Sequence, residues 1–275
     1  HVGGGFHRYC TDRDWTVPHF EKMLYDNAEI PRALLAGYQV TGDERYAAAV
    51  DESIAFLDRE LTHPDGGFYS TLDARSLGPD DDPDTPSHRG EEGAFYVWTP
   101  ETVHGAVDDE RAADLFCARY GVTEAGNFEG QTVLTIAERL DALADEHEMT
   151  EAEVEAAIED ARKQAFAARA ERPRPGRDEK VLAGWNGLVI SLLAEAGIVL
   201  DSAHTERGAA ALSFVRERLW DDDAGRLARR YKDGDVKGEG YLEDYAFLGR
   251  GALDLYGATG DVEHLAFALD LARAI

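Results

Sequence analysis

A long segment that recurs along the chain constrains its fold more than any other feature. One copy, DNAEIPRALLAGYQVTGDERY, begins at Asp26, and another, DYAFLGRGALDLYGATGDVEHL, begins at Asp244. Both carry a tyrosine near their middle, followed by a Thr-Gly-Asp turn. A weaker copy, WNGLVISLLAEAGIVLDSAHTERG, begins at Trp185 and lacks the Thr-Gly pair. Such repeats are typical of stacked units that bury their apolar faces only against one another.

Each copy predicts a hairpin of two helices. Apolar side chains recur at helical spacing in the first helix, at Leu34, Leu35 and Tyr38, and again in the second, which ends in FLDREL or FVRERL. The first helix is the more apolar, since LVISLLAEAGIVL is almost continuous, whereas charges flank the second. An inner ring of buried helices within an outer amphipathic ring explains this asymmetry. We therefore expect an all-α fold, an incomplete (α/α)6-type toroid of helical hairpins, with an open solenoid as the alternative.

The pattern changes between the first copy and the one at Trp185. The stretches GGFYST, EGAFYVWT and GNFEGQTVLTI are short, aromatic and β-branched, which predicts small strands or hairpins. Between them, SLGPDDDPDTPSHRGEE predicts an exposed Pro/Asp loop, and helices are expected at about 137–147 and 150–171. We expect residues 1–275 to form one partial toroid domain with a strand-rich insertion around 66–136.

The charge balance limits the possible partners. Asp and Glu number 55 against 28 Lys and Arg, a net charge of −27, and only five of the basic residues are lysines. Such a surface repels nucleic acid and anionic membranes. The balance predicts a halophilic protein whose charges are screened by concentrated salt, with an ordinary acidic protein as the alternative.

The cysteines and the ends of the chain bear on compartment and completeness. Cys10 and Cys117 stand far apart without a CxxC pair, so neither a disulfide framework nor a zinc site is expected. No signal peptide or long apolar run occurs, which predicts a soluble cytoplasmic protein. The chain opens on His1 and ends within a helical pattern, so we expect a piece of a longer protein. No HExxH, Walker or dinucleotide motif occurs, and no metal or cofactor is predicted.

Three inner helices are expected to begin at equivalent polar positions. Pro31 cannot lie deep in a helix, so the first helix is predicted to start near Asp26. Asp26 and Glu29 then match a D-x-x-E capping box, which explains both without any chemistry. Asn186 and Asp244 stand at or next to equivalent places, so all three helices would direct polar groups and helix dipoles at one cavity mouth.

Two histidines and several polar or aromatic groups complete the candidate site. His7 and His19 are suited to proton transfer near neutral pH, although structural or surface roles are the alternative for each. In the stretch EEGAFYVWT, carboxylates stand beside aromatic rings, a combination that suits a sugar ligand. The alternative for this stretch is an edge hairpin whose aromatic side chains belong to the core. The candidate catalytic residues are His7, His19, Asp26 and Asp244. The candidate substrate-binding residues are Arg8, Lys22, Asn27, Glu92, Trp98, Lys180, Trp185, Asn186 and Tyr241.

Six blocks in order, HVGGGFHRY, VPHFEKMLYDNA, EEGAFYVWT, NFEGQTVL, DEKVLAGWNGL and GYLEDYAF, carry a resemblance. They are similar to the thioredoxin-domain-containing family that includes spermatogenesis-associated protein 20. The resemblance implies an N-terminal thioredoxin-like domain, absent from this chain, followed by an (α/α)6 barrel similar to N-acylglucosamine 2-epimerases and glycosidases. The C-terminal part of the barrel would also be absent.

Two functions follow as hypotheses. The first is a carbohydrate-related catalytic domain that epimerises or isomerises a sugar or hydrolyses a glycosidic bond, with a sugar-like ligand as partner. It rests on fold-level analogy together with the residues named above. The second is a non-catalytic binding or scaffold module that serves a thioredoxin-like domain in redox or quality-control work.

Overall fold

The computed structural model describes residues 2–78 and 90–275, and most of the predicted Pro/Asp loop lies outside these residues. The chain forms two compact units. We call the first the insertion unit; it comprises the described residues of 1–3, 8–21 and 73–176. The second, the hairpin unit, comprises Gly4–His7, Lys22–Leu72 and Arg177–Ile275.

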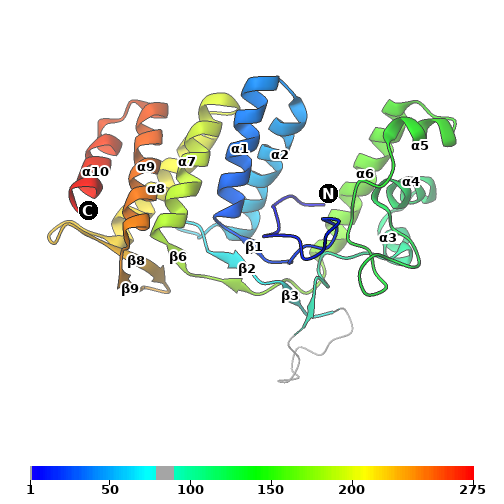
Figure 1. Ribbon diagram of the computed structural model, residues 1–275, viewed down its shortest axis with the longest axis horizontal. Coiled ribbons are helices and arrows are strands. Elements are labelled where there is room, and N and C mark those ends of the chain that lie inside the picture. The colour runs from blue at the N-terminus through cyan, green and yellow to red at the C-terminus, as the bar shows by residue number, and fades with distance from the viewer. Residues whose placement is uncertain (1, 79–89) are drawn as a thin grey trace. The chain divides into compact units, whose positions relative to one another are not determined.

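Three helical hairpins make up most of the hairpin unit, and Figure 1 shows their first helices, α1, α7 and α9, side by side. The hairpins are α1 (Asp26–Thr41) with α2 (Glu44–Phe56), α7 (Ala183–Val199) with α8 (Ala203–Leu219), and α9 (Leu242–Thr259) with α10 (Val262–Arg273). A π-helical turn, η1 (Leu57–Leu61), extends α2. This arrangement confirms the predicted all-α class and the hairpins of an incomplete (α/α) toroid.

The Thr-Gly-Asp turn acts in both copies as the sequence suggested. Gly42 and Gly260 end α1 and α9 in the left-handed conformation, with φ of 68° and 71°, which glycine adopts without steric cost. The next residue, Asp43 or Asp261, caps the following helix by accepting a backbone N–H two residues on. The repeated turn therefore fixes where each hairpin folds back.

Close approach of α7 and α9 depends on glycines in both helices. A Cβ atom on Gly187 would lie 2.5 Å from the backbone of Leu248, and one on Gly251 would lie 2.7 Å from the carbonyl oxygen of Gly187. Most of α7 is buried, whereas α8 and α10 each keep an exposed face. The predicted contrast between inner and outer helices is therefore clearest for α7.

Short strands lie at the end of the hairpin unit where α7 and α9 begin (Figure 1). One sheet pairs β1 (Lys22–Met23), β2 (Thr71–Leu72) and β5 (Arg177–Asp178), all antiparallel. The other sheet has the order β6-β8-β7, with β9 also paired to β8, and contains β6 (Val181–Leu182), β7 (Trp220–Asp221), β8 (Arg226–Lys232) and β9 (Asp235–Glu239). The sheets bring loop residues from distant parts of the sequence to the helix starts.

The insertion unit has its own core, built mainly of helices. Its elements are β3 (Arg75–Ser76), β4 (Glu91–Glu92), α3 (Pro100–Ala106), α4 (Glu110–Tyr120), α5 (Leu140–Glu146) and α6 (Glu151–Ala170). The two helices expected near 137–147 and 150–171 are confirmed as α5 and α6. The range 66–136, for which a strand-rich insertion is expected, holds the short strands β2, β3 and β4 together with helices α3 and α4, which bury Val103, Leu115 and Phe116.

The predicted capping box at the start of α1 is also wrong. The helix does begin at Asp26, but the preceding Tyr25 is itself helical and no side chain caps the helix among the described residues. The carbonyl of Tyr25 accepts the N–H groups of Ala28 and Glu29. The Glu29 carboxylate instead lies 2.8 Å from the guanidinium of Arg32, and that ion pair removes it from the cap. Asp26 and Glu29 therefore do not form the predicted capping box.

Candidate functional site

Asn27, a candidate ligand-binding residue, joins α1 to the glycine-rich start of the chain. Its Oδ1 accepts the N–H of Phe6 at 2.6 Å, and its Nδ2 donates to the carbonyls of Phe6 and Met23 at 3.0 and 2.9 Å. The side chain is fully buried. Its polar atoms satisfy backbone groups that burial would otherwise leave unpaired.

Asn186 repeats this arrangement in α7. It is also fully buried, and it exchanges two hydrogen bonds with the backbone of Phe68 while donating a third to the carbonyl of Leu182. At the equivalent position of α9, the hydroxyl of Tyr245 accepts the N–H of Leu227 at 2.9 Å. We call these three side chains the helix clamps. Each fixes the start of an inner helix to an extended segment.

Lys22 holds the glycine run from within the hairpin unit. Its side chain is 3% exposed, and its ammonium donates to the carbonyls of Gly4 and Gly5 at 2.7 and 3.0 Å. Its Nζ lies 4.9 Å from the ring centroid of Phe56. Gly5 has a φ of 76°, and a Cβ there would lie 2.6 Å from the Phe56 ring, so only glycine fits. Lys22 thus shapes the backbone that leads to His7.

At the start of α9, Asp244 orients a cation against an exposed ring. Its buried carboxylate accepts N–H groups from Gly184 and Tyr241 and lies 2.9 Å from Nη1 of Arg229. The same guanidinium lies 3.1 Å from Glu243 and 4.3 Å from the centroid of the Tyr241 ring. Burial alone would lower the pKa of Arg229, but the hydrogen bonds to Glu243 and Asp244 raise it overall, so Arg229 stays charged. Tyr241 is 61% exposed.

The starts of α1 and α7 carry further candidate groups. The rings of Tyr25 and Trp185 meet edge to face, with centroids 4.9 Å apart, and both are partly exposed. Asp26, next to Tyr25, is also partly exposed. Lys180 lies 2.8 Å from Asp178. Burial opposes the effect of this contact, yet the Lys180 hydrogen bond lowers the pKa of Asp178 below its ordinary value.

Other candidate residues belong to the insertion unit. The imidazole of His19 stacks on Tyr9 with centroids 5.0 Å apart, and its Nδ1 lies 3.5 Å from Glu21. Arg8 lies 3.4 Å from the same Glu21 carboxylate oxygen. These residues therefore form a polar cluster within the insertion unit. His7 belongs instead to the hairpin unit, where it is half-buried.

Glu92 and Trp98 have contacts of a different kind. Glu92 pairs with Arg75 in the β3–β4 ladder. Trp98 is 1% exposed, packs edge to face on Phe116, and has the guanidinium of Arg172 4.1 Å from its ring centroid. In the described conformation Trp98 is part of the core and offers no face to a ligand.

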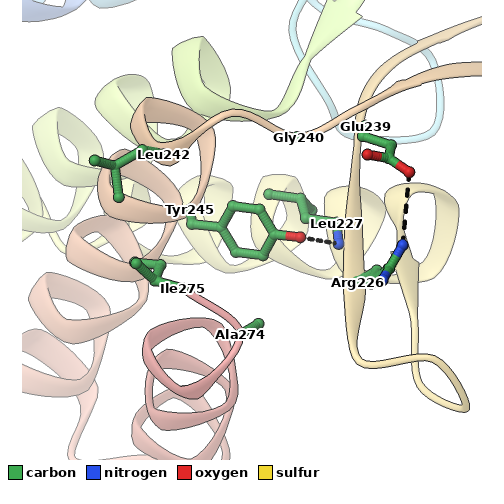
Figure 2. A pocket seen from close by; sticks show the side chains of 8 residues that line it. All are labelled: Arg226, Leu227, Glu239, Gly240, Leu242, Tyr245, Ala274 and Ile275. Atoms are coloured by element: carbon green, nitrogen blue, oxygen red, sulfur yellow. Dashed lines mark hydrogen bonds and ion pairs between the residues drawn. The ribbon is translucent and has the colours of Figure 1, made fainter.

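A hollow of about 340 Å³ lies beside the α9 start, in the hairpin unit. Figure 2 shows the Tyr245 hydroxyl directed at the N–H of Leu227, and the ion pair of Arg226 with Glu239 across the rim. Leu242 and Ile275 supply an apolar side. None of the candidate residues named from the sequence lines this hollow.

The candidate residues named from the sequence do not include Arg229 or Glu21, although both contact candidate residues directly. Arg229 lies in β8, and no local sequence pattern links it to Asp244. Glu21 stands two residues from His19, a spacing that places both side chains on one face of an extended segment. That alternation was a usable signal. Within the described part of the chain no group of three or more His, Cys, Asp or Glu residues is arranged to hold a metal ion.

Comparison with known proteins defines the relatives of this part-toroid domain. No family profile matches the chain. It is 39% identical over 298 residues to human spermatogenesis-associated protein 20 and 37% identical over 301 residues to the rat protein, covering 98% of this chain in each case. The chain is thus homologous, over nearly its whole length, to part of spermatogenesis-associated protein 20, which confirms the resemblance carried by the six blocks. It spans 37% of the length of these relatives.

Solved structures with sugar-related names are more distant. A D-mannose isomerase is 13% identical, with a TM-score of 0.34 and coverage of 98% of this chain and 79% of that one. A cellobiose 2-epimerase from Bacillus thermoamylovorans is also 13% identical, with a TM-score of 0.34 and coverage of 99% and 65%. TM-scores this low do not establish a shared fold.

Among the described helices, none combines the length and apolar character needed to cross a membrane.

Proposed function

We propose that the hairpin unit binds a carbohydrate at the starts of its inner helices. The observation that carries this proposal is the Tyr241 ring, which is largely exposed while Arg229 is held against it by Asp244 and Glu243. An exposed ring offers a flat apolar surface to the C–H face of a sugar. The neighbouring guanidinium and carboxylate can bind the hydroxyl groups at its edge.

The aromatic pair at the start of α7 supports the same ligand class. Tyr25 and Trp185 are partly exposed and meet edge to face, so they form a rigid apolar surface. Asp26 follows Tyr25 directly and adds a carboxylate. Aromatic surfaces beside hydrogen-bonding groups are what a neutral polyol requires, whereas the net charge of −27 disfavours anionic polymers.

For an enzyme, the proposed chemistry is proton transfer at a sugar carbon or hydrolysis of a glycosidic bond. Asp26 and His7, which both belong to the hairpin unit, remain the proposed proton carriers of this site, and His19 of the insertion unit is assigned no part in it. Asp244 has a different proposed part from the one its sequence position suggested. Its carboxylate is buried and already engaged by two N–H groups and Arg229, which favours positioning Arg229 over contact with substrate.

The proposed ligand is tested on the full-length protein in concentrated salt, with neutral sugars, sugar phosphates and short oligosaccharides scored by thermal shift. We expect at least one neutral sugar to raise the melting temperature. Tyr241→Ala should abolish that shift, and Tyr241→Phe, which keeps the ring, should retain it. A shift that survives in Tyr241→Ala would place the ligand elsewhere. No shift with any sugar would favour the alternative, a non-catalytic module that serves a thioredoxin-like domain in cis.

A further inference from the structure

A hairpin of the insertion unit presents an indole to solvent in an unfavourable backbone conformation. Residues 8–10 run antiparallel to 18–21, with hydrogen bonds from Arg8 N–H to the Glu21 carbonyl and from His19 N–H to the Tyr9 carbonyl. Trp15, near the tip of this hairpin, is 81% exposed and has a φ of 58°. Bulky residues rarely adopt this left-handed region, which glycine enters freely.

The hairpin tip is held by side-chain bonds, so this conformation is built into the loop. The Asp12 carboxylate accepts N–H groups from Thr16 at 3.0 Å and Val17 at 2.9 Å. These backbone bonds lower the pKa of Asp12, chiefly the bond from Val17, so the carboxylate stays ionised and keeps accepting them. Thr11 adds bonds from its N–H and its hydroxyl to the Val17 carbonyl.

Trp15 gains little burial in return for its strained backbone. Glycine or asparagine would fit the position better if the loop served only to turn the chain. Tyr9, the other exposed aromatic residue of the hairpin, already has His19 stacked on its ring and the Arg8 guanidinium 5.7 Å from its centroid. The indole of Trp15 has no ring contact of this kind among the described residues. A strained backbone that exposes a large apolar ring points to binding.

The groups around the indole restrict what it binds. Its neighbours at the tip, Asp12, Arg13, Asp14 and Thr16, are all polar. A protein-binding hot spot normally lies in a wider well-packed surface, which these residues do not supply. Asp12 and Asp14, close to Trp15 in the sequence, add negative charge to the tip and so disfavour a phosphate-bearing base or an anionic lipid. A sugar without negative charge meets neither obstacle, because its C–H face can stack on the ring while its hydroxyls bond to the polar neighbours.

We propose that Trp15 is a sugar-stacking platform of the insertion unit, separate from the site proposed at α9. Its ligand is a neutral or cationic hexopyranose unit, stacked on the indole and hydrogen-bonded by the polar side chains of the tip. The choice of ligand rests on the tip residues and not on the site at Tyr241.

The test follows Trp15 fluorescence in the full-length protein. Acrylamide should quench Trp15 readily, a component identified by its loss in Trp15→Phe. Methyl glucoside, N-acetylglucosamine and glucosamine should each change this component at millimolar concentration, and glucuronate should act more weakly because of Asp12 and Asp14. An inaccessible indole, which would mean that another domain covers it, overturns the proposal, as does the lack of any response to the three sugars.

Variants then separate the platform from simple folding effects. Trp15→Gly should leave the melting temperature unchanged or raised, because glycine relieves the strain, and should weaken sugar binding measured by calorimetry about threefold to tenfold. Trp15→Phe, which keeps a ring, should weaken it less, and Val40→Ala, at another exposed apolar position, should not weaken it. Unchanged affinity in Trp15→Gly would refute the platform. Tyr241→Ala should leave the Trp15 response intact, and its loss there would refute a separate site.

Discussion

Replacement of Asn186 tests whether the helix clamps hold the hairpin unit together. Asn186→Ala removes three hydrogen bonds and leaves the N–H and carbonyl of Phe68 without partners in a fully buried environment. Each lost bond costs about 1 kcal/mol net, and stranding buried polar groups adds to this, so we expect a loss of about 3–5 kcal/mol. That is a large part of the roughly 5–15 kcal/mol by which a domain is stable.

The assay is urea unfolding at fixed salt, analysed by linear extrapolation. Ser191→Ala is the matched control, because Ser191 lies in the same helix, is fully buried, and its hydroxyl has no hydrogen-bond partner among the described residues. It should change the unfolding free energy by less than about 1 kcal/mol. Asn186→Asp keeps the acceptor but loses both donors, so it should be destabilised and partly recover when acidification restores one donor. The clamp account fails if Asn186→Ala costs no more than the serine control.

Three further predictions concern other groups. Lys22→Met should lower the unfolding free energy by about 2–4 kcal/mol in urea, because it leaves two glycine carbonyls in the loop without their charged donor; an effect below about 0.5 kcal/mol would contradict that. Arg45 lowers the pKa of Asp43 to about 2. The ionised Asp43 carboxylate therefore contributes to stability above pH 3.8, and this contribution is lost as the pH falls towards 2. The wild-type advantage over Asp43→Asn in melting temperature should shrink across that window, and a constant difference would refute it. Burial raises the pKa of Cys117 to about 11, so iodoacetamide at pH 8 should leave it unmodified in the folded protein and label it in urea, as read by mass spectrometry.

The hairpins were predictable because their signals are local and repeated. Two Thr-Gly-Asp turns combine a left-handed glycine with an aspartate cap, and each signal is legible within a few residues. Helix α3 carried a comparable signal, since Thr99 precedes Pro100 and forms a capping box with Thr102. The neighbouring aromatic and β-branched stretches obscured it. The cap is a signal of only a few residues, whereas the stretches that favour strands are longer.

The candidate site was less predictable because its contacts join distant parts of the sequence. Asn27 and Asn186 were identified as polar groups at helix starts, but their partners Phe6 and Phe68 could not be seen from local pattern. Glu29 left its expected cap because Arg32 binds it, and Arg32 is itself held by Glu195 at 2.6 Å, across to α7. Polar residues at a cavity mouth and polar residues that hold a backbone look alike in sequence.

The Asn186 clamp also bears on the order in which the chain folds. It joins residues 118 positions apart, and closing so long a flexible loop costs about 4 kcal/mol of chain entropy. Within the insertion unit, however, the N–H of Asp73 bonds to the carbonyl of Gly176 at 2.7 Å, which brings together the two ends of the segment 73–176. If that segment folds first, Leu72 and Arg177 start out as neighbours, and β2 and β5 can pair without the long search. The insertion would then serve the hairpin unit as a preassembled connector, and its early collapse would set the rate at which α7 joins α1.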